Sequence, residues 1–150
     1  MERAVYLSLE KMRAGAGGPF GAVVARGGEQ IAEGWNQVTS ANDPTAHAKI
    51  VAIRKAAAAF DTFDLSGCTL YASTEPCPMC LAAAYWARME SIVFANRRAA
   101  AADAGFDDAT IYREIALDAA ERALPIVHRH RDDAAAALQE WADKPDKIQY

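Results

Sequence analysis

His47-Ala48-Lys49 and Pro76-Cys77-Pro78-Met79-Cys80 are the two stretches of sequence that decide how this chain folds. Cys77 and Cys80 are spaced i, i+3 at an expected helix start, which places both sulfurs on one helix face. His47 falls in the first turn of a second expected helix. Two thiolates and one imidazole supply three of the four ligands of a tetrahedral zinc ion. The two stretches therefore predict a zinc site with one open position, formed where two helix starts meet.

Other interpretations of these residues must be weighed against zinc. A C-x-x-C pair alone also fits a redox couple or a purely structural metal site, and a single histidine in a helix is usually structural. A helix start favours the thiolate form of a cysteine that lies there, which suits a metal ligand. The combination of all three residues at this spacing favours zinc over the alternatives.

The rest of the chain reads as alternating strands and helices. Apolar periodicity and Gly/Pro punctuation predict helices at 3–14, 77–87, 99–104, 109–123 and 132–141. Another helix is expected to open at Asp43-Pro44, with Asp43 as its cap and Pro44 in its first turn. Short apolar runs predict strands at 20–25, 31–36, 68–72, 91–95 and 125–128. The pattern indicates an α/β fold: one domain over residues 1–150, with helices on both faces of a sheet.

Composition restricts the classes of function. The formal net charge is −4 and the pI about 5.3, so the balance of charge supplies no positive face for nucleic acid. A small, uncharged or weakly charged substrate fits better. No apolar run is long enough to cross a membrane, and the start of the sequence has no signal-peptide core. The cysteine count of 3 is odd and argues against a disulfide framework, so we expect a soluble cytoplasmic protein.

Longer motifs surround the two stretches, and they carry a resemblance. They are Gly17-Gly18-Pro19-Phe20-Gly21-Ala22-Val23, Asn42-Asp43-Pro44-Thr45-Ala46-His47-Ala48, Glu75-Pro76-Cys77-Pro78-Met79-Cys80 and Tyr85-Trp86-Ala87-Arg88. With them the chain resembles the cytidine-deaminase-like superfamily almost end to end and, within it, the bacterial guanine deaminases. Ala104-Gly105-Phe106-Asp107-Asp108 and the terminal Tyr150 are more particular to the guanine deaminases.

The resemblance implies a fold, a reaction and an assembly. The fold would be a three-layer α/β/α domain with a five-stranded mixed sheet, holding one Zn²⁺ per subunit through His47, Cys77 and Cys80. The reaction would be hydrolytic deamination of guanine to xanthine and ammonia. The assembly would be a homodimer in which a segment of about 105–150 is exchanged between subunits. Cytosine and tRNA-adenosine deaminases share the zinc motifs and remain alternatives, although the acidic charge balance disfavours tRNA.

The resemblance also implies which residues would hold the purine. Asn36 and the backbone of Ala48 would bind the base, and Phe20 would stack on it. Trp86 would form part of the pocket wall. Asp108 would read the amino side of guanine and Tyr150 would close over the site, either of them serving the partner subunit. From pattern alone, these positions equally suit core, turn and chain-end residues.

Lys49 departs from the family pattern. Zinc nucleobase deaminases have a glutamate there, which is not a zinc ligand and carries protons during the reaction. A charged lysine has three hydrogen-bond donors and no acceptor, so it cannot take up a proton. The chain could be a deliberately inactivated enzyme, a natural variant with altered or lost chemistry, or an enzyme in which a neutral lysine works. A further alternative, from a different class, is a non-catalytic, zinc-stabilised purine-binding protein.

Overall fold

The computed structural model describes residues 1–106 and 108–149. The chain divides into two compact units, Met1–Thr110 and Ile111–Tyr150, here called the core unit and the C-terminal unit. Asp107 and Tyr150 lie outside the described residues. Among the residues described, no helix combines the length and the hydropathy that a membrane span requires.

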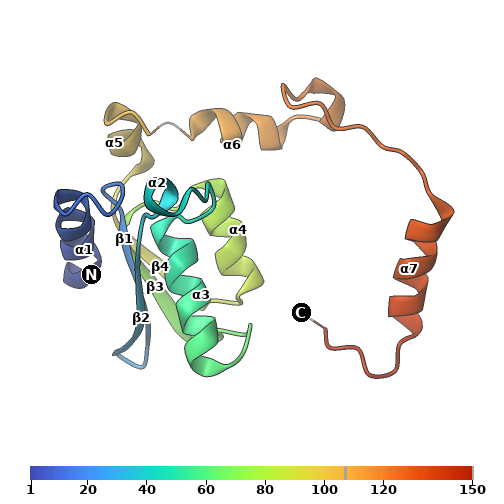
Figure 1. Ribbon diagram of the computed structural model, residues 1–150, viewed down its shortest axis with the longest axis horizontal. Coiled ribbons are helices and arrows are strands. Elements are labelled where there is room, and N and C mark those ends of the chain that lie inside the picture. Colours follow the sequence, from blue (N-terminus) through green and yellow to red (C-terminus); the bar gives the residue numbers. More distant parts are fainter. Residues whose placement is uncertain (107, 150) are drawn as a thin grey trace. The chain divides into compact units, whose positions relative to one another are not determined.

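A mixed sheet organises the core unit (Figure 1). Its strands are β1 (Gly21–Arg26), β2 (Glu29–Trp35), β3 (Cys68–Thr74) and β4 (Ser91–Asn96), in the order β2-β1-β3-β4. β1 pairs antiparallel with both of its neighbours, whereas β3 and β4 run parallel. The parallel pair needs a crossover connection, and α4 (Pro78–Trp86) lies in that connection.

The sheet has four strands within the described residues, so the expected fifth strand was wrong. Residues 125–128 form irregular chain between the 3₁₀ turn η1 (Ala119–Glu121) and α7 (Asp132–Asp143). Ile126 and Val127 are exposed there, at 53% and 74%. A short apolar run after a proline is consistent with a strand, but here no described strand pairs with it.

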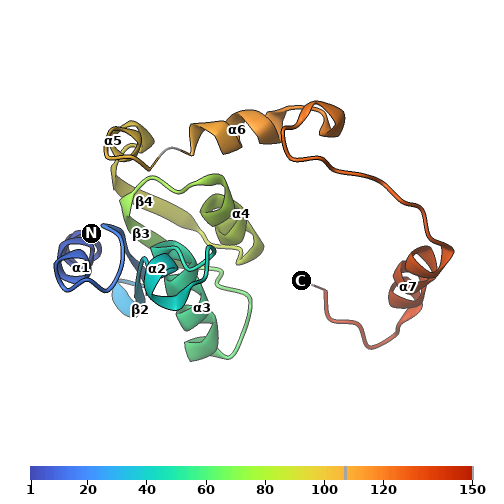
Figure 2. The same ribbon diagram turned by 45° about the horizontal axis from the view of Figure 1, so that its top comes forward.

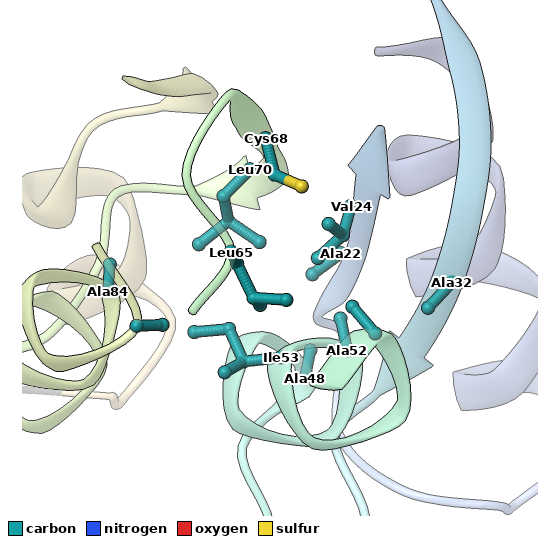
Figure 3. Close-up of a cluster of buried hydrophobic side chains, with 12 residues drawn as sticks. Ala22, Val24, Ala32, Ala48, Ala52, Ile53, Leu65, Cys68, Leu70 and Ala84 are labelled. Carbon is teal, nitrogen blue, oxygen red and sulfur yellow. The ribbon is translucent and has the colours of Figure 1, made fainter. Parts of the chain in front are cut away.

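Helices cover both faces of the sheet. α1 (Glu2–Arg13) packs Ala4 and Leu7 against Val23 on one face. α3 (Ala48–Phe60) and α4 lie on the opposite face, as Figure 2 shows. Neighbouring strand residues point to opposite faces, so Val24 joins the larger cluster on the α3 side. Figure 3 shows that cluster, which includes Ala22, Val24, Ala52, Leu65 and Leu70. The α/β class and the placement of helices on both faces are confirmed.

The start of α3 differs from the expected one. α3 begins at Ala48 rather than at Pro44, and a one-turn helix, α2 (Val38–Ala41), precedes it. The Asp43 carboxylate accepts hydrogen bonds from the Thr45 N–H (2.8 Å) and hydroxyl (2.7 Å), so it closes a turn before the helix. His47, not Asp43, is the N-cap residue. His47 therefore lies just before the first turn of α3, and its side chain is not part of the helix.

Glycine at position 34 lets α3 approach the sheet closely. A Cβ atom on Gly34 would lie 2.4 Å from the Ala48 carbonyl oxygen and 2.6 Å from the Ala52 nitrogen. Only a residue without a side chain fits between β2 and the first turn of α3. The helix start, and with it His47 and Lys49, is therefore held directly against the end of β2.

The later helices follow β4. α5 (Arg98–Asp103) and α6 (Ala109–Ala116) are short, and α6 ends seven residues before the predicted 109–123 helix would have ended. α7 spans Asp132–Asp143, close to the prediction, with Asp132 and Asp133 in its first turn. No described residue of the C-terminal unit is buried.

Candidate metal centre and active site

Three side chains from two helix starts converge on one point. The His47 Nδ1 atom lies 3.5 Å from Cys77 Sγ and 3.7 Å from Cys80 Sγ. All three candidate ligand atoms lie within 4.8 Å of one another. A tetrahedral zinc ion, with Zn–S of about 2.3 Å and Zn–N of about 2.0 Å, needs nitrogen and sulfur roughly 3.6 Å apart. The donor set and its spacing fit zinc.

The backbone explains this convergence. His47 is the N-cap residue of α3 and Cys77 that of α4, and both have extended dihedral angles. Pro78 occupies the first turn of α4, where its missing N–H costs nothing. Neither His47 nor Cys77 caps its own helix with its side chain. Both side chains are thus available to a metal ion.

Each of the two cysteines shifts the pKa of the other. A hydrogen bond from the Cys80 thiol lowers the pKa of Cys77 to about 4. The same hydrogen bond, followed by burial, raises the pKa of Cys80. A bound metal requires both sulfurs as thiolates, so metal binding would release the thiol proton of Cys80.

Lys49 is buried beside the metal centre, at 5% exposure. Burial is the largest influence on the pKa of Lys49 and lowers it, while electrostatic interactions with Cys80, Cys77 and Asp108 oppose that shift. Its Nζ atom lies 6.0 Å from the centroid of the Phe20 ring. The side chain at position 49 thus reaches toward both the sulfurs and the aromatic ring that the resemblance assigns to purine stacking.

Phe20 also contacts an aromatic side chain that sequence reasoning did not assign to the site. The rings of Phe20 and Phe106 meet edge to face, with centroids 4.8 Å apart. Phe106 lies in the segment that leads to Asp108, which faces the Lys49 of its own chain electrostatically. The expectation that Asp108 serves the partner's site stays a prediction. The sequence could have indicated Phe106 as a site residue, because it directly precedes Asp107 and Asp108.

Asn36 follows β2 and is buried, at 8% exposure. Its backbone N–H donates to the Phe20 carbonyl (3.0 Å), and the Gln37 N–H donates to the Ala46 carbonyl (2.9 Å). These bonds place Asn36 between Phe20 and the residue that precedes His47. Ala48 is the first residue of α3, where a helical N–H has no acceptor within the helix. The purine contacts of Asn36 and Ala48 stay predictions.

Three further residues lie away from the metal ligands or cannot be placed. Trp86 ends α4, about 9 Å along the helix from Cys80, and is 67% exposed; its role in the pocket wall stays a prediction. Tyr150 lies outside the described residues. Glu75 accepts a hydrogen bond from the Arg98 N–H (2.9 Å) at the start of α5, so it is engaged as a helix cap.

Comparison with known proteins assigns the class. Residues 1–96 match the family model for the cytidine and deoxycytidylate deaminase zinc-binding region, and the chain belongs to that family. The family and the His-Cys-Cys donor set agree on Zn²⁺ as the cofactor.

Within the family, the chain is similar to guanine deaminase from Bacillus subtilis (strain 168). The two are 47% identical over 150 residues, which is 100% of this chain and 96% of that protein. The X-ray structure of the Bacillus subtilis enzyme superposes with a TM-score of 0.96 at 48% identity, covering 99% of this chain and 95% of that one. A guanine deaminase structure from Nitrosomonas europaea matches with a TM-score of 0.68 at 38% identity, covering 71% and 62%. The resemblance drawn from the motifs is confirmed.

A tRNA-specific adenosine deaminase from Aquifex aeolicus matches less of the chain. It is 42% identical over 76 residues, or 51% of this chain and 50% of that protein. Similarity to the tRNA-specific adenosine deaminase thus covers about half of the chain, whereas similarity to the guanine deaminase covers all of it.

Proposed function

We propose that this site is built for the hydrolytic deamination of guanine to xanthine and ammonia. The full-length similarity to a guanine deaminase carries the proposal, because it continues through the second half of the chain. Similarity to a tRNA-adenosine deaminase covers only about half of the chain. The acidic net charge of −4 also suits a free base better than a nucleic acid.

In this proposal His47, Cys77 and Cys80 hold the zinc ion. Bound zinc supplies Lewis-acid chemistry and makes a water-derived nucleophile available near neutral pH. The chain's own residues bind and orient the base around that centre. Phe20 stacks on the purine, the Asn36 amide and the Ala48 N–H bind it, and Asp108 accepts from its amino side. Trp86 and Tyr150 complete the enclosure.

The residue at position 49 determines the rate at which this chain would deaminate guanine. The resemblance places there the residue that moves a proton from water to the ring and to the leaving ammonia. An ammonium group has no acceptor for that proton. General acid–base catalysis contributes roughly 10²–10⁴-fold to rate. We therefore propose that the chain with Lys49 folds, holds zinc and deaminates guanine very slowly.

Restoring a carboxylate tests this function directly. The Lys49→Glu variant should release ammonia from guanine at least ~10²-fold faster than the parent chain at equal zinc content. The measurement is a coupled ammonia assay, with zinc quantified in both samples. Lys49→Gln is the matched control, since it removes the charge of lysine without adding a proton acceptor of carboxylate strength. Equal rates for the parent and Lys49→Glu would show that position 49 is not the proton carrier.

Lys49 also supports a second candidate, a zinc-stabilised purine-binding protein without turnover. Its buried position beside Phe20 leaves the core and the metal ligands undisturbed. A protein of this kind would bind guanine, and Lys49→Glu would leave ammonia release undetectable. The ammonia assay therefore separates the two candidates.

We further propose that the active form is a homodimer in which C-terminal segments are exchanged. Both units carry exposed apolar side chains that suit burial against another surface: Tyr85, Trp86, Val93 and Phe94 in the core unit, and Ile111, Ile115, Leu138 and Trp141 in the C-terminal unit. The exchanged segment would be about residues 105–150, so Asp108 and Tyr150 would serve the site of the partner subunit.

A further inference from the structure

The amide of Asn36 has a fixed orientation. The Val38 backbone N–H donates to Asn36 Oδ1 at 3.2 Å. A backbone N–H can only donate, so the oxygen of the amide must face Val38 and the NH₂ group must face away from it. Within the described part of the chain Nδ2 makes no hydrogen bond, and it is not among the fully buried polar atoms. Nδ2 is therefore the donor that the Asn36 side chain can offer to a ligand.

The backbone of Gly17 and Gly18 packs against this asparagine. Gly17 has φ +151°, and a Cβ atom there would lie 1.7 Å from the Asn36 carbonyl oxygen and 2.8 Å from its carbon. A Cβ atom on Gly18 would lie 3.5 Å from Cγ and Oδ1 of the Asn36 side chain, in ordinary contact. The loop is fixed in turn, because the Ser40 hydroxyl donates to the Ala16 carbonyl (3.1 Å). The backbone of the loop is thus packed on Asn36 more closely than any residue with a side chain would allow.

A nearby glycine shows that this packing is not a general property of the loop. Gly15 has φ +67°, yet a Cβ atom there would meet nothing within 4 Å. Gly15 is needed for its backbone conformation alone, whereas Gly17 is needed for both its conformation and its contact with Asn36.

We infer that Gly17 is a positioning residue for the Asn36 amide, and that its lack of a side chain sets how strictly the site selects ligands with a hydrogen-bond acceptor opposite Nδ2. This inference rests on the proposed function, since it assumes that a purine enters beside Phe20. A Cβ atom at position 17 would displace the Asn36 carbonyl and rotate the residue. The amide would then no longer point at the ligand, while the zinc ligands stay in place. The chemical consequence is a loss of discrimination between purines that differ by one acceptor.

Binding competition measures this discrimination without requiring turnover. Zinc-loaded parent chain is equilibrated by dialysis with labelled guanine, and unlabelled 3-deazaguanine, 7-deazaguanine and 2-aminopurine compete. 3-Deazaguanine lacks the N3 acceptor, 7-deazaguanine lacks the N7 acceptor, and 2-aminopurine lacks the O6 acceptor and has an acceptor in place of the N1–H donor. At least one should bind the parent about tenfold more weakly than guanine, because an unpaired donor in the site is costly. In Gly17→Ala that ratio should fall to within about threefold, while in Gly15→Ala it should stay at the parent value.

Asn36→Asp provides a second variant that keeps the local fold. The carboxylate still accepts from the Val38 N–H but offers no donor to a ligand, so the ratio should collapse as it does in Gly17→Ala. Zinc content in each variant shows that the metal centre is intact. Discrimination that persists in Gly17→Ala, or a parent that distinguishes none of the competitors although it binds guanine, would overturn this inference alone. A parent and a Lys49→Glu variant that both fail to bind guanine would overturn the proposed function and this inference together.

Discussion

The core unit and the C-terminal unit differ in what happens to their apolar side chains. In the core unit Leu7, Leu65 and Leu70 are at most 1% exposed and lie between the sheet and its helices. In the C-terminal unit Leu124 and Leu138 are each 74% exposed. Helices α6 and α7 nevertheless form, with apolar residues at helical spacing. Local sequence is enough to specify a helix, but a helix of this length gains most of its stability from packing, which the core unit has and the C-terminal unit lacks by itself.

Removing one metal ligand would change the core unit most. Cys80→Ala should reduce zinc from about one ion per chain to near zero and destabilise the core unit by several kcal/mol, since metal affinity and folding are linked. Zinc analysis and thermal unfolding measure the two effects. Cys68→Ala is the matched control, because Cys68 is equally buried but lies outside the metal cluster. A Cys80→Ala chain that kept its zinc would refute the ligand assignment.

A pair of leucine truncations would sharpen the contrast between the units. Leu70→Ala should cost about 2–5 kcal/mol of unfolding free energy, because it leaves a cavity in a closed core. Leu138→Ala should cost less than about 0.5 kcal/mol at low protein concentration, where an exposed side chain contributes little. Urea unfolding of both variants gives the comparison.

The same Leu138→Ala variant tests the proposed homodimer. If exchanged segments bury Leu138 against a second chain, the variant should weaken association, and its destabilisation should grow with protein concentration. Sedimentation equilibrium of the parent and the variant detects the shift. A parent that stays monomeric at all concentrations would contradict the exchange.

A pH-dependent effect should come from an ion pair that ties α1 to β2. Arg3 donates from Nε and from Nη2 to the two carboxylate oxygens of Glu33, both at 2.7 Å. These hydrogen bonds lower the pKa of Glu33 below its ordinary 4.5. The folded-state pKa is the lower one, so the stabilisation is complete above about pH 4.5 and is lost as pH falls through the folded-state value.

We expect Glu33→Gln to cost about 0.5–1 kcal/mol at neutral pH, because both partners are partly exposed and screened by solvent. The cost should shrink as the pH falls through the folded-state pKa of Glu33, and urea titrations at neutral and at acid pH measure the difference. Glu29→Gln, at an exposed position on the same strand, is the control. A cost that did not change with pH would assign the role of Glu33 to packing.

The sequence predicted the parts of this structure that depend on local pattern. The four core strands, α1, α4 and α7 were placed within a few residues, and the spacing of His47, Cys77 and Cys80 predicted their convergence. The start of α3 was missed because Asp43-Pro44 imitates a helix start, whereas Gly34 and β2 set where α3 can begin. The strand expected at 125–128 was wrong because strand pairing is not local. The contact between Phe20 and Phe106 depends on how distant segments pack, and sequence spacing does not encode it.

The positions of His47 and Cys77 carry one consequence for how this fold can be changed. Each occupies a site where serine, threonine or aspartate would normally strengthen a helix by about 1 kcal/mol. A substitution such as His47→Ser would strengthen the start of the helix and at the same time remove a zinc ligand. At these two residues, selection for greater stability therefore conflicts with selection for metal binding.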